Sequence, residues 1–210
     1  LFDCGEVNRN EIDYLLFCTQ SPDYILPTSA CIIQDKLGLR KDIGALDFNL
    51  GCSGYVYGLS LAKGLICGGI AKNVLLLTGE TYNKHLHLRD KGNRTIFGDA
   101  ASATVISTSG IARIGNFSLG TDGSGAGNLI ITSGGMRCPE KQNDLSFDEN
   151  NNPCSSDYLY MNGSEIFTFT LDRVPPLIRT TLVKNLLEQN DVDLLSLIHI
   201  SEPTRLLSIS

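Results

Sequence analysis

The 210-residue chain lacks the features that would direct it to a membrane, a nucleic acid or a metal ion. No apolar run approaches the roughly 20 residues that cross a bilayer. The 17 Lys and Arg residues are scattered and are outnumbered by 23 Asp and Glu residues, and the net charge is −6. This balance does not favour nucleic acid or an anionic membrane surface as a partner. The three histidines and seven cysteines show no spacing typical of a zinc site.

Cysteine usage indicates a reducing compartment. Cys18, Cys31 and Cys67 lie in apolar runs and are predicted to be reduced core thiols of a cytoplasmic protein. Cys138 and Cys154 lie in polar segments and could pair, which a reducing compartment disfavours. No secretory signal pattern precedes the first predicted strand. The 42% hydrophobic content suits one large or two small globular domains.

Strand and helix patterns alternate along the first half, which predicts an α/β fold with a mainly parallel sheet. Strands are expected over residues 12–19, 45–50, 73–78 and 103–107, and helices over 28–36 and 53–66. The second half is expected to contain strands at 113–119 and 128–132, an exposed polar loop at 139–157, a helix at 164–189 and a strand from 193. Pro175 and Pro176 should break or kink that last helix.

Cys52 lies where the strand over residues 45–50 gives way to a helix. The free N–H groups and the positive end of the dipole at a helix N-terminus favour a thiolate. That effect is about 0.3–1 kcal/mol, so a neighbouring base or cation would be needed for full activation. The alternative is a cysteine that fills apolar space. Glycines inside the helix, at 54, 58 and 64, predict close approach of another backbone and a buried helix.

Four stretches of the chain resemble the β-ketoacyl-acyl-carrier-protein synthase III family of thiolase-fold condensing enzymes. They are residues 12–39, the cysteine motif at 49–55, the Phe-Gly-Asp turn at 96–103 and the Met-x-Gly segment at 160–167. Their order and spacing agree across residues 1 to about 194. The resemblance implies a layered αβαβα thiolase-like fold of two related halves, truncated at both ends. Residues 1–110 would form most of the N-terminal half, and residues 111–194 the start of the C-terminal half.

The resemblance also implies a reaction for Cys52. An acyl group passes from acyl-CoA to this cysteine, and the carbanion formed from malonyl-acyl carrier protein by loss of CO2 then attacks the acyl-enzyme. Backbone N–H groups, including that of Cys52, would hold the thioester oxygen. The substrate is a coenzyme A thioester, and no metal or tightly bound cofactor is expected. Members of such a family would act as homodimers in fatty acid or related biosynthesis.

Two departures from the family pattern concern substrate binding. Lys91 stands where the family often has an Arg that helps to hold the CoA adenine, and lysine lacks the planar stacking face. Leu26 occupies a loop position that is often aromatic and that would reach the partner's acyl pocket in the dimer. Leu26 therefore predicts an altered acyl-chain preference.

Three further residues are expected to have structural roles near the site. Gly98 and Asp99 form a tight turn in which the carboxylate would bond to backbone rather than act as a general base. Asn49, together with Asp47, lies on the strand that leads to Cys52. These two residues could orient the site or could equally be paired polar positions of a sheet.

Residues 195–210 resemble a translated sequencing adapter and are excluded from fold reasoning. His199 falls near the place of the family's catalytic His, which we interpret as coincidence. The family's C-terminal His and Asn are thus not matched, so the chain alone is expected to be inactive in condensation.

Two weaker patterns have ordinary interpretations. His85 and His87 could form a metal pair, but solvated loop residues fit them better. Residues 120–127 resemble a phosphate-binding loop without its Gly-Lys-Ser/Thr ending, which favours a flexible loop near the pocket. Two alternative functions stay open: a non-decarboxylating thiolase-fold acyltransferase, and a non-catalytic homologue that serves as a dimer partner.

Overall fold

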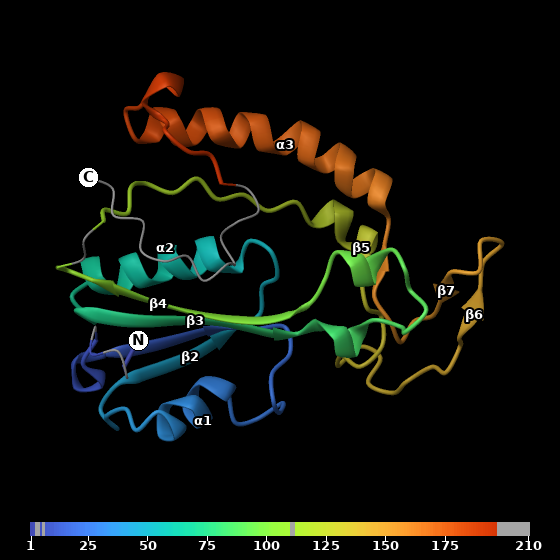
Figure 1. Cartoon of the computed structure of the whole chain (residues 1–210), viewed down its shortest axis with the longest axis horizontal. Helices are drawn as coiled ribbons and strands as arrows, with labels where there is room; N and C mark the ends of the chain where they lie inside the picture. Colours follow the sequence, from blue (N-terminus) through green and yellow to red (C-terminus); the bar gives the residue numbers. More distant parts are fainter. Residues whose placement is uncertain (3–4, 6, 110–111, 197–210) are drawn as a thin grey trace. The chain divides into compact units, whose positions relative to one another are not determined.

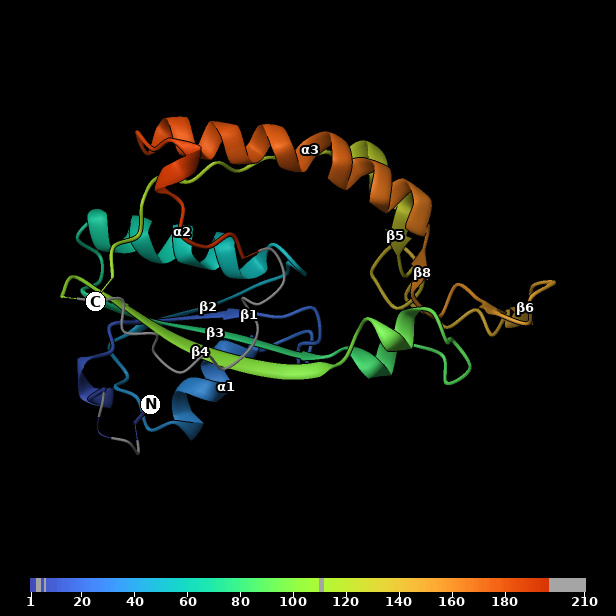
Figure 2. The ribbon, with the colours of Figure 1, turned by 45° about the horizontal axis from the view of Figure 1, so that its top comes forward.

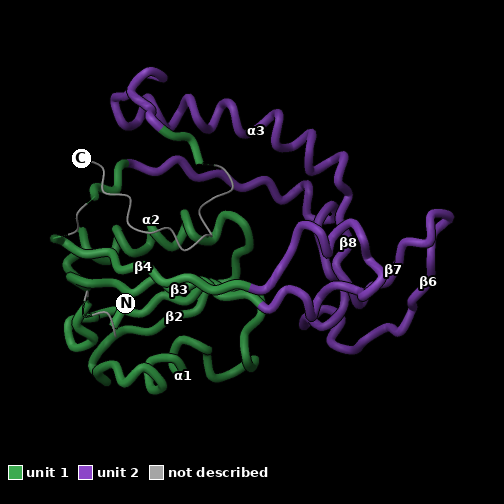
Figure 3. Tube along the Cα trace, viewed as in Figure 1, with its two compact units in different colours: residues 1–80, 100–115, 194–210 green, residues 81–99, 116–193 purple. Residues whose placement is uncertain are grey.

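A computed structural model describes residues 1–2, 5, 7–109 and 112–196. His199 and most of the predicted adapter segment lie outside these residues. The chain divides into two compact units (Figure 3). Unit 1 contains residues 1–80, 100–115 and 194–210, and unit 2 contains residues 81–99 and 116–193. These units are the parts of the chain that make most of their contacts internally. The division into two related halves at residue 110 is a different division and stays a prediction.

Unit 1 is built on a mixed four-stranded sheet with the strand order β2-β1-β3-β4. The strands are β1 (Tyr14–Cys18), β2 (Gly44–Phe48), β3 (Asn73–Thr81) and β4 (Asp99–Ser107). β1 pairs in parallel with both β2 and β3. The hydroxyls of Thr78 and Ser102 lie 2.7 Å apart, and the N–H of Thr108 donates to the carbonyl of Lys72. These contacts show that β4 runs antiparallel to β3.

Two helices cover opposite faces of this sheet (Figures 1 and 2). They are α1 (Ser29–Lys36) and α2 (Gly54–Cys67). Neighbouring residues of β1 point to opposite faces of the sheet. Leu16 belongs to the hydrophobic cluster that contains Ala62 of α2, and Leu15 belongs to the one that contains Ala30 of α1. Successive strand side chains point to opposite faces, so a sheet covered on both sides needs continuous apolar runs. This confirms the α/β prediction for the first half.

Close approach of α2 to the sheet depends on two of its glycines. A Cβ on Gly58 would lie only 2.6 Å from Leu76 Cδ1 and 3.1 Å from Phe48 Cζ. Gly54 is equally restricted, whereas a Cβ on Gly64 would meet no atom within 4 Å. The nearest atoms at Gly54 and Gly58 belong to side chains, so the predicted close approach of another backbone is wrong there, and Gly64 has no close neighbour at all. The prediction of a buried helix is also wrong, because α2 buries only its sheet-facing side: Gly54, Gly58 and Ala62.

The prediction of core thiols holds for Cys18 alone among the three cysteines in apolar runs. Cys18 is buried at the end of β1, whereas Cys31 and Cys67 are exposed. Cys31 follows the buried Ala30 on α1, and consecutive helical residues are about 100° apart around the axis. An apolar run in a helix that covers one sheet face therefore leaves some of its side chains in solvent.

Unit 2 contains one long helix and two small antiparallel ladders (Figure 1). The helix is α3 (Gly163–Lys184). The ladders pair β5 (Leu129–Ile130) with β8 (Tyr160–Met161), and β6 (Ser146–Phe147) with β7 (Pro153–Cys154). Residues 113–119 form no strand, and no strand begins between residue 193 and the end of the described part at 196, so both predictions are wrong. Apolar composition alone did not distinguish these segments from extended coil.

The helix α3 continues through Pro175 and Pro176, so the predicted break is wrong, and its alternative, a kink, stays a prediction. The two prolines deprive the carbonyls of Leu171 and Asp172 of their helical N–H partners. Both of these residues are exposed, so water can satisfy the carbonyls. Among the described residues, no helix combines the length and the apolarity that crossing a membrane requires.

Candidate active site

Cys52 occupies an exposed turn between β2 and α2. The N–H of Gly54 donates to the carbonyl of Gly51 at 2.8 Å and closes the turn, and α2 begins at Gly54. Ser53 is the N-cap residue of α2, but its side chain makes no capping hydrogen bond. The predicted placement of the thiol at the start of a helix is therefore confirmed. Its exposure makes the thiol accessible to a substrate.

The buried thiol of Cys18 lies behind this turn. Its Sγ donates to the carbonyl of Leu50 across 3.2 Å, and only 4% of the residue is exposed. A Cβ on Gly54 would overlap Cys18 Sγ. Burial raises the pKa of the Cys18 thiol, with the Glu80 carboxylate adding to the effect, so the thiol stays protonated and can donate. One side chain thus contacts both the entry and the exit of the Cys52 turn.

Glu80, near the end of β3, anchors the segment that follows β1. Its carboxylate accepts the N–H of Gln20 at 2.7 Å and the hydroxyl of Ser21 at 2.9 Å. The Gln20 side chain lies against the turn, because its Oε1 would be 2.9 Å from a Cβ on Gly51. The ends of β1 and β3 therefore both support the turn that carries Cys52. Sequence reasoning missed Gln20 and Glu80, which no motif singles out.

The two polar residues at the end of β2 have different environments. Asp47 caps α1, since its two carboxylate oxygens accept the N–H groups of Ser29 and Ala30, each at 2.6 Å. This role matches neither of the two alternatives for Asp47. Asn49 is exposed just after β2 and three residues before Cys52. Its contribution to the site stays a prediction.

Leu26 belongs to the same unit as Cys52 and lies in the loop before α1. Leu26 is 79% exposed, and its neighbours Tyr24 and Ile25 are also exposed. An exposed run of three large apolar side chains on one loop is typical of a contact surface. The position suits a residue that reaches another chain, and the homodimer stays a prediction.

Lys91, Gly98 and Asp99 all fall in unit 2. Lys91 is exposed in a turn. Asp99 Oδ1 accepts the N–H of Asn83 at 2.9 Å, which is the kind of backbone contact expected of it, and Gly98 is exposed beside it. The structure therefore groups Cys52, Asn49 and Leu26 in unit 1 and the other three in unit 2.

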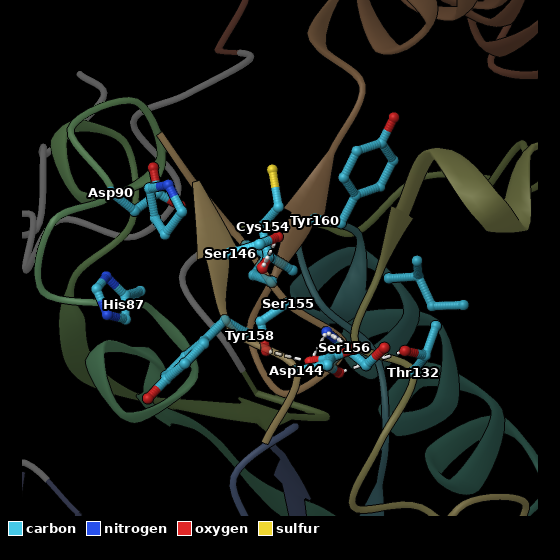
Figure 4. A pocket seen from close by; sticks show the side chains of 13 residues that line it. His87, Asp90, Thr132, Asp144, Ser146, Cys154, Ser155, Ser156, Tyr158 and Tyr160 are labelled. Carbon is cyan, nitrogen blue, oxygen red and sulfur yellow. Dashed lines mark hydrogen bonds between the residues drawn. The ribbon is translucent and has the colours of Figure 1, made fainter. Parts of the chain in front are cut away.

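Unit 2 has a pocket of about 420 Å³ in which several polar groups bond to one another (Figure 4). Asp144 accepts the hydroxyl of Ser155 at 2.8 Å and the N–H of Ser156 at 3.0 Å. His87 packs edge-on against Tyr158, with ring centroids 5.0 Å apart. Cys52 is not among the residues that line this pocket. The pocket therefore does not mark the proposed nucleophile.

The two weaker sequence patterns have structural explanations. Within the described residues, no group of His, Cys, Asp or Glu could hold a metal ion, and His85 and His87 are half-buried rather than fully solvated. Residues 123–128 form a short 3-10 helix. Asp122 caps it by accepting the N–H and hydroxyl of Ser124, and it also pairs with Arg173 at 3.0 Å. These contacts define residues 123–128 as a capped 3-10 helix, and the flexibility of the segment and its place near the pocket stay predictions.

A strand that ends in an exposed thiol turn, followed by a helix on a mixed sheet with helices on both faces, is the architecture of a thiolase-like half. Solved structures support this class. The chain is similar to a 3-oxoacyl-(acyl-carrier-protein) synthase III at 49% identity, covering 92% of this chain and 58% of that one, with a TM-score of 0.87. The corresponding enzyme of Burkholderia xenovorans LB400 is 38% identical over 92% of this chain and 54% of its own, with a TM-score of 0.77.

Sequence comparisons agree with the structural ones. Residues 46–123 match the family model of 3-oxoacyl-[acyl-carrier-protein] synthase III. The β-ketoacyl-[acyl-carrier-protein] synthase III of Chlamydia caviae is 33% identical over 89% of this chain and 54% of its own length. The β-ketoacyl-[acyl-carrier-protein] synthase III of Clostridium perfringens is 36% identical over 89% of this chain and 55% of its own length. These similarities are to proteins named 3-oxoacyl- or β-ketoacyl-[acyl-carrier-protein] synthase III, and the chain spans about half the length of these relatives.

Proposed function

We propose that the protein to which this chain belongs condenses an acyl-CoA with malonyl-acyl carrier protein through an acyl-Cys52 intermediate. The observation that carries the proposal is the exposed Cys52 on the turn that begins α2, within the segment that matches the family model. The similar proteins are named 3-oxoacyl- or β-ketoacyl-[acyl-carrier-protein] synthase III, names that describe the product of such a condensation.

The first half-reaction transfers the acyl group. The Cys52 thiolate attacks the thioester carbon of acyl-CoA, the C–S bond to coenzyme A breaks, and the released CoA thiolate takes up a proton. Backbone N–H groups at the start of α2 and that of Cys52 are suited to stabilise the oxyanion. The helix terminus contributes about 0.3–1 kcal/mol to the thiolate, so another group of the whole protein must complete its activation.

The second half-reaction forms the carbon–carbon bond. Malonyl-acyl carrier protein loses CO2, and the electron pair of the broken bond becomes a carbanion that attacks the acyl-Cys52 carbonyl. Collapse of the tetrahedral intermediate expels the Cys52 thiolate and releases the 3-oxoacyl-carrier protein. The scheme balances with coenzyme A and CO2 as by-products, and it uses no metal or resident cofactor.

The remaining predicted residues serve binding or local structure in this proposal. Lys91 offers a charge to the phosphates of coenzyme A without a stacking surface for the adenine. Leu26, exposed on its loop, enters the acyl pocket of the partner in a homodimer. Gly98, Asp99 and Asn49 shape the backbone near the site. The six cysteines of the described residues are all free, which suits a cytoplasmic protein.

A condensation assay with the full-length protein tests the proposal. The expected result is formation of 3-oxoacyl-carrier protein and CO2 from acyl-CoA and malonyl-carrier protein, lost in Cys52→Ala. The matched control, Cys31→Ala, removes an exposed cysteine of α1 and should keep full turnover. Acyl transfer without CO2 release would instead support a non-decarboxylating acyltransferase. Absence of any acyl transfer in the unchanged protein would support a non-catalytic dimer partner.

A further inference from the structure

We infer that Cys18 is a positioning residue that sets the geometry of the Cys52 turn through its buried thiol. The inference rests on the proposed role of Cys52. Its basis is that one thiol contacts both ends of the turn: Cys18 Sγ donates to the carbonyl of Leu50 at 3.2 Å and fills the space beside Gly54. The turn itself closes through the 2.8 Å hydrogen bond from Gly54 N–H to the Gly51 carbonyl.

The thiol contributes a hydrogen-bond donor. The Leu50 carbonyl lies between the end of β2 and the turn, and the sheet ladder of β2 ends at Phe48. The hydrogen bond is partly buried, where loss of the donor is unfavourable, so the thiol holds Leu50 in place. Cys18 is opposite Phe48 in the parallel ladder, which brings its side chain within reach of the chain just beyond β2.

The sulfur atom of Cys18 also fills the space that the missing side chain of Gly54 leaves open. A Cβ on Gly54 would overlap Cys18 Sγ, but it would be 3.8 Å from Cys18 Cβ and 3.4 Å from Leu50 Cβ. These last two distances are ordinary van der Waals contacts. The sulfur atom is therefore the group that requires glycine at the first residue of α2. Sulfur and glycine together fix how far the start of α2 stands from β1.

The consequence concerns the reactivity of the Cys52 thiol rather than only the stability of the unit. The N–H groups at the start of α2 favour the thiolate only while the turn keeps its position relative to the helix. Loss of the Cys18 donor lets the Leu50 carbonyl and the turn relax. Cys18 touches no substrate in this account and acts through the backbone of residues 50–54.

The test measures alkylation of Cys52 by iodoacetamide, which requires no other catalytic group. Trypsin releases residues 42–63, in which Cys52 is the single cysteine, so mass spectrometry follows this thiol alone. Cys18→Ala should slow its alkylation by about two- to fivefold, the range of one modest hydrogen bond. Cys18→Ser keeps a donor and should restore the rate to within about twofold. Cys31→Ala, at the exposed thiol of α1, is the matched control and should change nothing.

A second pair of variants tests the volume match. Gly54→Ala should slow alkylation because its methyl group displaces Cys18 Sγ or the turn. In the double variant Gly54→Ala/Cys18→Ala, Cys52 should be alkylated faster than in Gly54→Ala alone, because the clashing Sγ of Cys18 is absent. Circular dichroism melts accompany each variant, and Cys18→Ser carries the test of the donor if Cys18→Ala fails to fold.

Different outcomes would contradict the positioning role of Cys18 and the proposed function of Cys52. Equal alkylation rates in Cys18→Ala and the unchanged protein, or no recovery in Cys18→Ser, would overturn the positioning role. Slower alkylation of Cys52 in the double variant than in Gly54→Ala alone would also overturn the positioning role. A protein whose Cys52 alkylates as expected but is never acylated by acyl-CoA would instead refute the proposed function and leave the positioning result standing.

Discussion

The carboxylate of Asp47 on β2 accepts the N–H of Ser29, the first residue of α1, at an O···N distance of 2.6 Å. The N-cap residue, Thr28, makes no side-chain capping bond, so Asp47 supplies the cap from a neighbouring strand. A carboxylate at a helix N-terminus is also favoured by the helix dipole. This contact couples the strand that leads to Cys52 with the helix on the opposite face from α2.

Replacing Asp47 should therefore destabilise unit 1. Asp47→Ala is expected to lower the free energy of unfolding by about 1–2 kcal/mol, the usual cost of a lost N-cap. Asp47→Asn keeps one acceptor and should cost less. Urea unfolding followed by circular dichroism measures both, with Asp35→Ala on the exposed side of α1 as control. A loss no greater than that of the control would contradict the capping role.

Glu80 should matter for the anchoring of residues 20 and 21. Glu80→Ala removes the acceptor of the Gln20 N–H and the Ser21 hydroxyl and is expected to cost about 1–3 kcal/mol of unfolding free energy. Glu80→Gln retains one oxygen acceptor and should cost less. Chemical denaturation measures the loss, and Glu149→Ala, in an exposed loop of unit 2, is the control. Equal stability of Glu80→Ala and this control would show that the anchor is unimportant.

Asp13 should make stability depend on acidity. A hydrogen bond from Lys72 N–H, assisted by Asn73 N–H and the Arg40 charge, lowers the pKa of Asp13 below its ordinary 3.8. Because the folded pKa is the lower one, this contribution is complete above the unfolded value and is lost as the pH falls through the folded value. The stability difference between the unchanged protein and Asp13→Asn should be constant from about pH 7 to pH 5 and shrink below about pH 4. Urea midpoints across this range provide the measurement, and a difference independent of pH would refute the assignment.

Leu26 should influence which acyl chains the dimer accepts. If its side chain enters the partner's acyl pocket, Leu26→Phe reduces the space there and should lower kcat/KM for longer acyl-CoA substrates by about tenfold relative to acetyl-CoA. The neighbouring Ile25, which is 92% exposed, offers the matched control Ile25→Phe. Kinetics over a series of chain lengths in the full-length protein measures the preference. Identical profiles for the two variants would exclude Leu26 from the pocket.

Much of unit 1 could be predicted because its signals are local. Apolar runs bounded by turn residues indicated all four strands and both helices, and small residues around Cys52 indicated the strand-to-helix turn. Unit 2 was harder because its ladders are two residues per strand, too short for any periodicity. The helix α3 was not predicted to continue through Pro175 and Pro176, because proline removes the N–H donors of two helical hydrogen bonds. Solvent can satisfy the two exposed carbonyls instead.

The support around Cys52 could not be predicted for a different reason. Cys18 precedes Gly54 by 36 positions, and only the parallel pairing of β1 with β2 brings them together. In the sequence, Cys18 is one more apolar residue in a strand. The Asp47 cap is similarly non-local, because it joins a strand to a helix that precedes it in the chain. Contacts of this kind depend on strand register rather than on any motif.

Acylation of Cys52 tests the central claim most directly. The full-length protein is incubated with acetyl-CoA alone, digested with trypsin and analysed by mass spectrometry. The account predicts that the peptide of residues 42–63 gains one acetyl group and that Cys52→Ser abolishes this gain. An unmodified Cys52, or an acetyl group on another cysteine instead, would contradict the assignment of Cys52 as the nucleophile.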